Sequence, residues 1–188
     1  MQIVNTQNFE TQAGLIGTTY NIKNMNSKNE LKNILIKLSD VKLTKLEGKK
    51  MVVNLKNESN LNVLQQFEEK IKNFIISEFN TSNETIGPLV YTSEAENKSE
   101  AFASASANNF IYVRLNNYSS FYDLDGEDVE MNENKVFADC ILKFDTITYI
   151  NNKYYINGSI YQALIKEIVE ETNNKILLNF ESEFMNNF

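Results

Sequence analysis

The stretch ADCILKFDTITYINNKYYINGSIYQALIKEI, residues 138–168, decides the fold. Apolar side chains of one parity run through its first half, at Cys140, Leu142 and Phe144. Such alternation, with many β-branched and aromatic residues, is typical of a half-buried β-strand. The Asn151-Asn152-Lys153 segment then supplies residues that tolerate the positive φ angles of a tight turn, and the apolar pattern resumes at Tyr154. We therefore expect a long β-hairpin, around which the remaining strands close a sheet.

The end of this stretch fits two kinds of secondary structure. Ser159 and Gln162 have the spacing of a helical capping box. The apolar residues that follow at helical steps are Ile160, Leu164 and Ile168. The residues that would instead line one face of a final strand are Tyr161, Ala163 and Ile165. Both interpretations stay open from the sequence.

A second hairpin and one helix are expected upstream. In residues 33–46 apolar side chains alternate with lysines, and residues 51–56 read as the returning strand after a turn at 47–50. Residues 60–78 change to apolar steps of three and four. This spacing predicts an amphipathic helix, with Ser59 or Asn60 as its N-cap.

The second half of the chain begins with a long connection. Residues 79–107 lack periodicity and contain the only proline, and a connection of this length tends to be functional. Alternation returns in residues 109–115 as a strand, and Asp125-Gly126 predicts a tight turn. The expected fold class is therefore α+β and β-rich, with one helix between pairs of strands.

The chain has the length of a single domain with a real core. Residues 1–22 show little periodicity and predict an N-terminal arm, or one or two weak strands. Residues 23–170 form the expected domain, and residues 171–188 form a C-terminal tail. No apolar run reaches the length of a membrane span, and the N-terminus lacks a signal-peptide pattern. We therefore expect a cytoplasmic, intracellular protein without membrane contact.

Composition excludes several chemistries. The chain has no histidine and a single cysteine, Cys140, which rules out histidine-based catalytic triads, zinc ribbons and iron–sulfur clusters. Cys140 lies within a strand pattern, so we expect a buried structural thiol. No glycine-rich phosphate loop occurs among the six glycines. We expect neither a cofactor nor enzymatic activity.

The most acidic segment spans residues 123–133. It does not match a calcium-binding EF-hand loop, because Phe121 and Asn132 occupy the first and twelfth ligand positions. A two-metal phosphodiesterase site would have to draw on Asp123, Asp125, Asp139 and Asp145. Asp123 and Asp125 have no basic partner nearby in sequence. We interpret the segment as a solvated acidic turn, and a metal-dependent nuclease ranks third among the functional hypotheses.

Charge is distributed unevenly along a chain of net charge -7. Residues 23–72 hold eleven lysines against six acidic residues, whereas residues 73–188 hold seven basic against eighteen acidic residues. Phosphate binding depends on clustered cations, so the first segment suits a nucleic-acid groove. A background composition rich in lysine and asparagine explains the asymmetry equally well.

The basic hairpin and one aromatic strand are the best candidates for a binding site. Lysines from two adjacent strands and their turn must in part share a face. At alternate positions, Phe110, Tyr112 and Arg114 form a strip of two rings and a guanidinium. Rings that stack on bases and cations that contact phosphates are how proteins hold single-stranded nucleic acid without reading sequence. The candidate nucleic-acid-binding residues are Lys42, Lys45, Lys49, Lys50, Phe110, Tyr112, Arg114, Tyr149 and Tyr154.

Residues 135–165 resemble the C-terminal part of single-stranded-DNA-binding proteins from large DNA viruses and phages. The run from Tyr149 to Tyr154, followed by Gly158 and Gln162, fills the places of that family's hairpin, glycine and glutamine. Tyr149 stands where the family pattern has tryptophan. The order of the preceding elements is similar too, so the likeness spans about residues 33–168. The resemblance implies an OB-like antiparallel barrel over residues 23–170 that coats single strands.

The leading hypothesis is non-specific single-stranded DNA binding in replication, through a basic groove and aromatic stacking. Single-stranded nucleic acid would be the main partner. A homo-oligomer and replication proteins that contact the C-terminal tail are the further partners considered. The alternative is a structural or assembly protein of a virus or mobile element that acts through protein–protein contacts.

Overall fold

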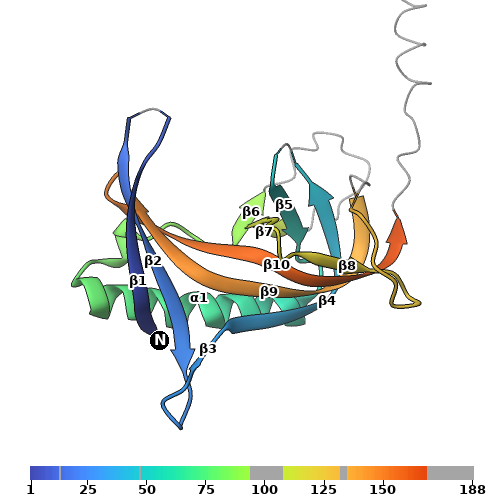
Figure 1. The fold of residues 1–188 in the computed structure, drawn as a ribbon, viewed down its shortest axis with the longest axis horizontal. Coiled ribbons are helices and arrows are strands. Elements are labelled where there is room, and N and C mark those ends of the chain that lie inside the picture. The colour runs from blue at the N-terminus through green and yellow to red at the C-terminus, as the bar shows by residue number, and fades with distance from the viewer. Residues whose placement is uncertain (13, 47, 94–107, 132–134, 169–188) are drawn as a thin grey trace, which may run out of the picture.

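The computed structural model describes residues 1–12, 14–46, 48–93, 108–131 and 135–168. In these ranges the chain has the expected β-rich α+β fold, with one α-helix and a sheet of ten strands (Figure 1). In chain order the elements are β1 (Gln2–Glu10), β2 (Ile16–Met25), β3 (Leu31–Lys32), β4 (Ile34–Lys45), β5 (Lys50–Asn54), α1 (Glu58–Phe79), the short helix η1 (Asn83–Thr85), β6 (Tyr91–Ser93), β7 (Asn108–Arg114), β8 (Ser120–Tyr122), β9 (Lys135–Ile150) and β10 (Lys153–Ile168).

β9 and β10 form the long hairpin that residues 138–168 predict. Their antiparallel pairing runs from Ile150 opposite Lys153 to Val136 opposite Ile168. At the turn, Asn151 and Asn152 adopt φ angles of 50° and 58°, a left-handed conformation that asparagine tolerates better than most residues. The pairing with β9 continues to the end of β10, so the segment after Gly158 is a strand and the helical interpretation is wrong.

α1 is the amphipathic helix expected over residues 60–78, but it begins earlier than expected. Its N-cap is Asn57, whose side-chain oxygen accepts a hydrogen bond from the Ser59 amide at 2.8 Å. Asn60, one of the two predicted caps, is buried instead. Its side chain donates to the Ser39 carbonyl at 2.6 Å and accepts from the Ser39 amide at 3.3 Å. Asn60 therefore docks the helix onto β4.

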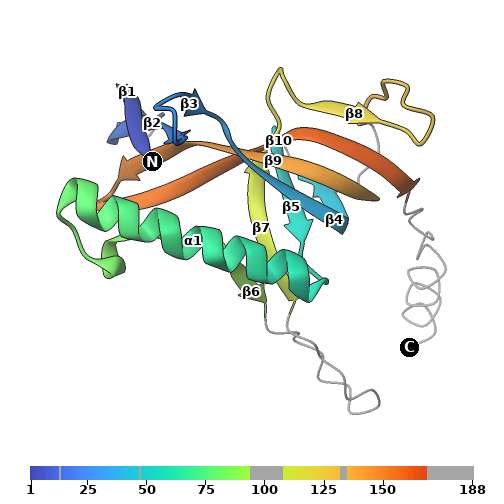
Figure 2. The ribbon, with the colours of Figure 1, turned by 90° about the horizontal axis from the view of Figure 1, so that it is seen from below.

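The core is divided into two clusters that α1 spans. The larger cluster lies between β4, β5, β7, β9 and β10 and receives Leu64 from the helix. The second cluster joins Ile71 and Ile75 of α1 to Ile22 of β2 and Ile147 of β9. Figure 2 shows the helix running along the β9–β10 hairpin. The long hairpin thus belongs to both cores, which explains why its pattern dominates the sequence.

The strand order is β1-β2-β9-β4-β5-β7-β10-β8, and β9 also pairs with β10. The pairings therefore pass from β9 through β4, β5, β7 and β10 and return to β9. The link between β7 and β10 is a single parallel pair, Arg114 with Ser159. Apart from the contacts of β10 with β7 and β8, the pairings between these strands are antiparallel.

The N-terminal residues are built into this sheet. β1 and β2 form a hairpin, and β2 pairs with β9 from Thr18 to Asn21. The predicted boundary between residues 22 and 23 therefore falls within β2. The predicted tail, residues 171–188, lies outside the described residues, as do residues 94–107 of the long connection.

Two single features complete the description of the fold. Cys140 is buried as expected, and burial raises the pKa of its thiol to about 12, with the Asp139 carboxylate adding to the effect. In the described part of the chain, no helix is long and apolar enough to cross a membrane.

Candidate nucleic-acid interface

The register of β5 and β7 brings the candidate residues of two segments onto one face. Lys50 lies opposite Arg114, and the next outward-facing pair is Val52 with Tyr112. Residues directly opposite each other on antiparallel strands project to the same side of a sheet. The following pair, Asn54 with Phe110, continues this face. The predicted strip on β7 therefore lies beside a lysine on β5.

Three aromatic rings cluster at one end of this face. Tyr91 of β6 lies opposite Phe110, and their rings stack with centroids 5.7 Å apart. Tyr112 meets both rings edge-on, with centroid distances of 5.3 Å to each. The Tyr112 side chain nevertheless remains 47% exposed. The cluster is thus a supported aromatic surface with one ring open to solvent.

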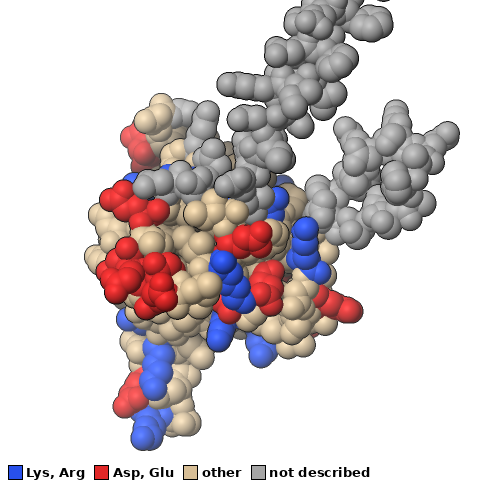
Figure 3. All heavy atoms as spheres, turned by 90° about the vertical axis from the view of Figure 1, so that its right-hand side faces the viewer, with Lys and Arg blue, Asp and Glu red and all other residues tan. Residues whose placement is uncertain are grey.

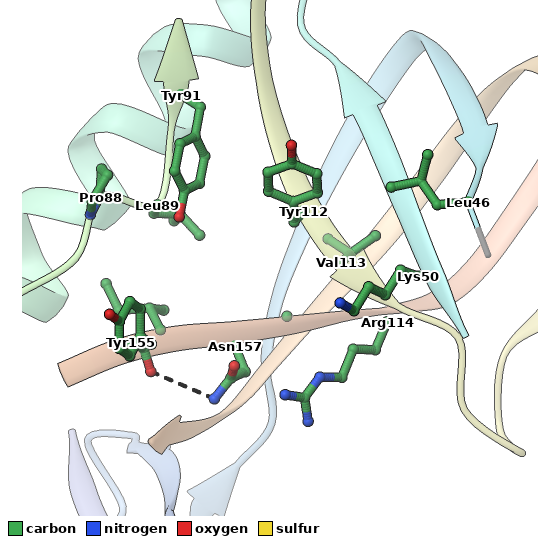
Figure 4. A pocket seen from close by; sticks show the side chains of 12 residues that line it. Leu46, Lys50, Pro88, Leu89, Tyr91, Tyr112, Val113, Arg114, Tyr155 and Asn157 are labelled. Carbon is green, nitrogen blue, oxygen red and sulfur yellow. Dashed lines mark hydrogen bonds between the residues drawn. The ribbon is translucent and has the colours of Figure 1, made fainter. Parts of the chain in front are cut away.

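A groove of about 440 Å³ runs beside these rings. The residues that line this tyrosine groove are Leu46, Lys50, Pro88, Leu89, Tyr91, Tyr112, Val113, Arg114, Tyr155, Ile156, Asn157 and Gly158. Figure 4 shows Tyr91 and Tyr112 on one side, with the side chains of Lys50 and Arg114 extending into the opening. The groove therefore has an aromatic part and a cationic part, and β7 contributes a side chain to each.

Glu68 of α1 fixes the segment that carries Tyr91. Its carboxylate oxygens accept hydrogen bonds from the Leu89 and Val90 amides at 3.1 and 3.2 Å, and Lys72 forms an ion pair with it at 2.7 Å. Burial raises the pKa of Tyr91, and the neighbouring Tyr112 adds to the increase. Tyr91 therefore stays neutral at physiological pH and offers an uncharged ring to a ligand.

Tyr155 enters the groove from β10 because a glycine leaves room for its ring. A Cβ atom at Gly87 would lie 2.9 Å from the Tyr155 ring, closer than real contacts allow. The Gly87 amide also donates to the Tyr154 carbonyl at 2.8 Å, which holds this segment against β10. On β10 the Asn157 side chain donates to the Thr148 hydroxyl at 2.8 Å, which positions its amide at the groove.

Lys42 shares the face of Lys50, but the other two candidate lysines do not. Lys42 lies opposite Asn54, on the outward side of the sheet. Lys45 instead donates to the Met131 carbonyl at 2.9 Å, and Lys49 donates to the Asn117 side chain at 3.3 Å. The turn between β4 and β5 thus separates lysines that are close in sequence.

The two remaining candidates, Tyr149 and Tyr154, belong to the second core. Tyr154 is only 9% exposed and stacks on Phe79 of α1 at 4.9 Å. Tyr149 packs on Tyr154 at 4.6 Å, and its hydroxyl donates to Asn152 at 3.2 Å. Burial raises the pKa of Tyr154. The ring of Tyr154 therefore stabilises the fold and is not open to a base.

The acidic segment forms the turn that the sequence predicts. The Gly126 amide donates to the Asp123 carbonyl, and Gly126 has a φ angle of 84°. Most side chains of residues 123–131 are exposed. Figure 3 views the molecule from the side on which Figure 1 places β8 and shows acidic groups on this face, with lysine and arginine groups among them. Within the described ranges, no group of three or more acidic or cysteine side chains is placed to hold a metal ion.

Tyr91 and Tyr155 are groove residues that sequence reasoning did not select. Tyr155 follows the selected Tyr154, and strand alternation alone does not say which of two adjacent tyrosines faces outward. Tyr91 follows the only proline, at a place where the sequence shows little periodicity.

The fold resembles that of a single-stranded DNA-binding protein from a phage. No protein-family model matches the sequence, and no curated protein matches it. Among solved structures, the C-terminally truncated single-stranded DNA-binding protein from bacteriophage Enc34 is similar, with a TM-score of 0.51 and 10% identity over 74% of this chain and 88% of that chain. The same phage protein in complex with ssDNA gives a TM-score of 0.50 at 9% identity, over 81% of this chain and 98% of that chain. The structural likeness confirms the resemblance to phage single-stranded-DNA-binding proteins, and at these identities it concerns the fold alone.

Proposed function

We propose that this protein binds single-stranded DNA without sequence preference, through the tyrosine groove. The observation that carries the proposal is the shared face of β5 and β7, where Lys50 and Arg114 lie beside Phe110 and Tyr112. Bases would stack on the exposed ring of Tyr112 and on the wall formed by Tyr91. The phosphate backbone would follow the cationic part of the groove. Lys42, further along the same face, extends the path for phosphates.

The composition of the groove favours single strands over duplex. Unpaired bases expose the flat faces that aromatic side chains need, whereas bases in a duplex are already stacked on each other. Each base–ring contact is worth about 1–3 kcal/mol, and the cations add an electrostatic contribution that salt weakens. Rings and cations accept every base, so little sequence preference is expected.

We further infer that the closed path of strand pairings is an OB-like barrel. In that fold, the face of the second and third strands and the adjacent loops bind oligonucleotides. In the path from β4 through β5 to β7, the second and third strands are β5 and β7. These strands carry Lys50 and Arg114. The position of the groove on the barrel therefore supports the same function as its chemistry. Such binding would serve DNA replication, in which exposed single strands are coated.

The proposal is tested by fluorescence anisotropy of a labelled oligo-dT and of a matched duplex, each at two salt concentrations. We expect tight binding of the single strand at low salt, weaker binding at high salt, and much weaker binding of the duplex. Absence of single-strand binding at low salt, with a folded protein, would refute the proposal.

A further inference from the structure

A row of paired residues crosses the sheet from the tyrosine groove to β9. Lys50 lies opposite Arg114, which pairs with Ser159 of β10. Ser159 in turn lies opposite Lys143 of β9. Residues paired in this way project to the same side of a sheet. The row covers the spacing of four neighbouring strands, about 14 Å in all. It therefore places a further cation, Lys143, in line with the two cations of the tyrosine groove.

The neighbours of Lys143 and Ser159 show that this row faces away from the core. On β9, Leu142 and Phe144 lie on either side of Lys143, and both are fully buried. On β10, Ile160 follows Ser159 and is fully buried as well. Successive side chains of a strand point to opposite faces. Lys143 and Ser159 therefore point outward.

Lys143 also lines a second groove, with a volume of about 480 Å³. The other residues of this Lys143 groove are Asn116, Tyr118, Ser120, Tyr161 and Gln162. One wall is the loop after β7, which the Ser119 hydroxyl holds on β10 by donating to the Ile160 carbonyl at 2.6 Å. Arg114 is the last residue of β7, immediately before this loop. The row from Arg114 to Lys143 thus connects the tyrosine groove with the Lys143 groove.

Ser159, between the two cations, has a hydroxyl group without a hydrogen-bond partner. Its side chain is only 6% exposed, and no described residue pairs with the hydroxyl. Buried hydroxyl groups in proteins are nearly always paired, and one explanation for an exception is a water or ion that binds there. A phosphate oxygen between Arg114 and Lys143 would accept this hydrogen bond once the side chains that cover the hydroxyl move aside. The unpaired hydroxyl therefore favours an anion at this point of the row.

Asp145 holds Lys143 in the absence of a ligand. The two side chains form an ion pair at 2.9 Å, with 23% of the lysine and 36% of the aspartate side chain exposed. Solvent-exposed pairs of this kind are worth about 0–1 kcal/mol. A phosphate can therefore replace the carboxylate at Lys143 at little cost. Asp145 should compete with DNA for Lys143 and lower the affinity of this part of the surface.

We propose that single-stranded DNA bound in the tyrosine groove continues across this row, where Lys143 contacts its phosphates, and enters the Lys143 groove. This inference rests on the proposed function and adds a second stretch to the path of the strand. Base stacking is weaker in this stretch, because Tyr118 is 79% exposed and no described ring packs on it. The contacts there are mainly to the backbone. A strand long enough to cover both grooves gains the Lys143 contact, and a shorter strand does not.

Oligonucleotide length separates the two stretches in an anisotropy experiment. OB folds contact about 4–16 nucleotides each, so the test uses oligo-dT of about four and of about twelve nucleotides. Lys143→Gln removes the charge and keeps part of the side-chain stem, whereas Asp145→Asn removes the competing carboxylate. Lys70→Gln and Glu69→Gln make the same charge changes at exposed positions of α1 and are the controls. Circular dichroism first shows that each variant folds.

We expect Lys143→Gln to bind the long oligonucleotide several-fold more weakly than the unmodified protein does. Its logarithmic salt slope should be shallower by about 0.7, the value for one lost phosphate contact on a single strand. Asp145→Asn should bind the long oligonucleotide several-fold more tightly. Both variants should bind the short oligonucleotide as the unmodified protein does, and the controls should not differ from the unmodified protein at either length.

Two results would overturn this inference and leave the proposed function intact. The first is that Lys143→Gln has no effect on binding, or the same effect at both lengths. The second is that Asp145→Asn brings no gain, or the same gain at both lengths. If the unmodified protein binds neither oligonucleotide, the proposed function itself fails and this inference fails with it.

Discussion

Lys50 and Arg114 lie directly opposite each other on β5 and β7, and both side chains reach the tyrosine groove. Neither residue makes an ion pair that would neutralise it among the salt bridges of the described residues. Two cations that form no ion pair with a described residue thus stand beside a half-exposed ring, Tyr112. Under the proposed function, this arrangement would let one short segment of DNA make a phosphate contact and a stacking contact together.

Tyr112→Ala should weaken binding of oligo-dT. The ring is 47% exposed and supported by Phe110, so its removal takes away one stacking surface. We expect a loss of about 1–3 kcal/mol in binding free energy, measured by anisotropy. Tyr112→Phe should bind almost as well as the unmodified protein. The control is Tyr118→Ala, a ring that is 79% exposed outside the groove. Equal losses for Tyr112→Ala and Tyr118→Ala would contradict the assignment.

Tyr154→Ala should mainly lower stability, whereas Tyr155→Ala should mainly weaken DNA binding. Tyr154 is buried against Phe79, so we expect its loss to lower the free energy of unfolding by about 3–5 kcal/mol, as truncation of buried rings does. Tyr155 lines the groove, so its loss should mainly weaken DNA binding. Denaturant unfolding and anisotropy separate the two effects. Equal effects of the two variants in both measurements would show that the adjacent side chains do not divide their roles in this way.

Glu68→Gln should weaken DNA binding although Glu68 does not line the tyrosine groove. The change replaces one of the two acceptor oxygens by an NH2 group and leaves a single carbonyl oxygen to accept from the Leu89 and Val90 amides, and a buried amide without an acceptor costs about 1–3 kcal/mol. The segment that carries Tyr91 should become less firmly held against α1. We expect a small drop in stability and a loss of oligo-dT affinity that is smaller than the loss for Tyr112→Ala. Glu69→Gln, at the neighbouring exposed position, is the matched control. Unchanged binding by Glu68→Gln would show that α1 does not position Tyr91.

Asp139 should make stability depend on pH in the acid range. Burial raises the pKa of its carboxyl group, but hydrogen bonds from Lys166 and from the Asp40 amide outweigh this and lower the pKa below 3.8. Because the pKa of this carboxyl group is lower in the folded state than in the unfolded state, its ionised form stabilises the fold at pH values above the unfolded-state pKa. This stabilisation is lost as pH falls through the folded-state pKa. Because solvent screens the ion pair between Asp139 and Lys166, the contribution to the free energy of unfolding should be small. Asp139→Asn should show a flatter loss of stability below about pH 4 in unfolding experiments. If stability depends on pH identically in Asp139→Asn and in the unmodified protein, the Asp139 carboxylate is not a source of the acid dependence.

The sequence predicts the strands and the helix well because their hydrophobic periodicity is strong. The β9–β10 hairpin, its Asn-Asn turn, the β4–β5 hairpin and α1 all follow from local patterns. The site is predicted only in part. Alternation placed Phe110, Tyr112 and Arg114 on one strip, and the register of β5 puts Lys50 beside them.

The rest of the site depends on contacts between distant segments, which local patterns do not encode. Adjacent tyrosines have the same strand propensity, so only packing on α1 decides that Tyr154 turns inward and Tyr155 outward. Lys45 and Lys49 turn away because the Met131 carbonyl and the Asn117 side chain bind them. Asn60 does not cap the helix, because its side chain donates a hydrogen bond to the Ser39 carbonyl and so holds α1 against β4.

The most direct test compares two double variants that remove the same charge. Lys50→Ala with Arg114→Ala removes the cations of the groove, whereas Lys45→Ala with Lys49→Ala removes two lysines that point elsewhere. The measurement is oligo-dT affinity as a function of salt concentration, after circular dichroism has shown that both variants fold. We predict that the groove variant binds weakly and that its logarithmic salt slope is shallower by about 1.4, at ~0.7 for each lost phosphate contact on a single strand. The other variant should keep the slope of the unmodified protein. Equal slopes for the two variants would contradict the account.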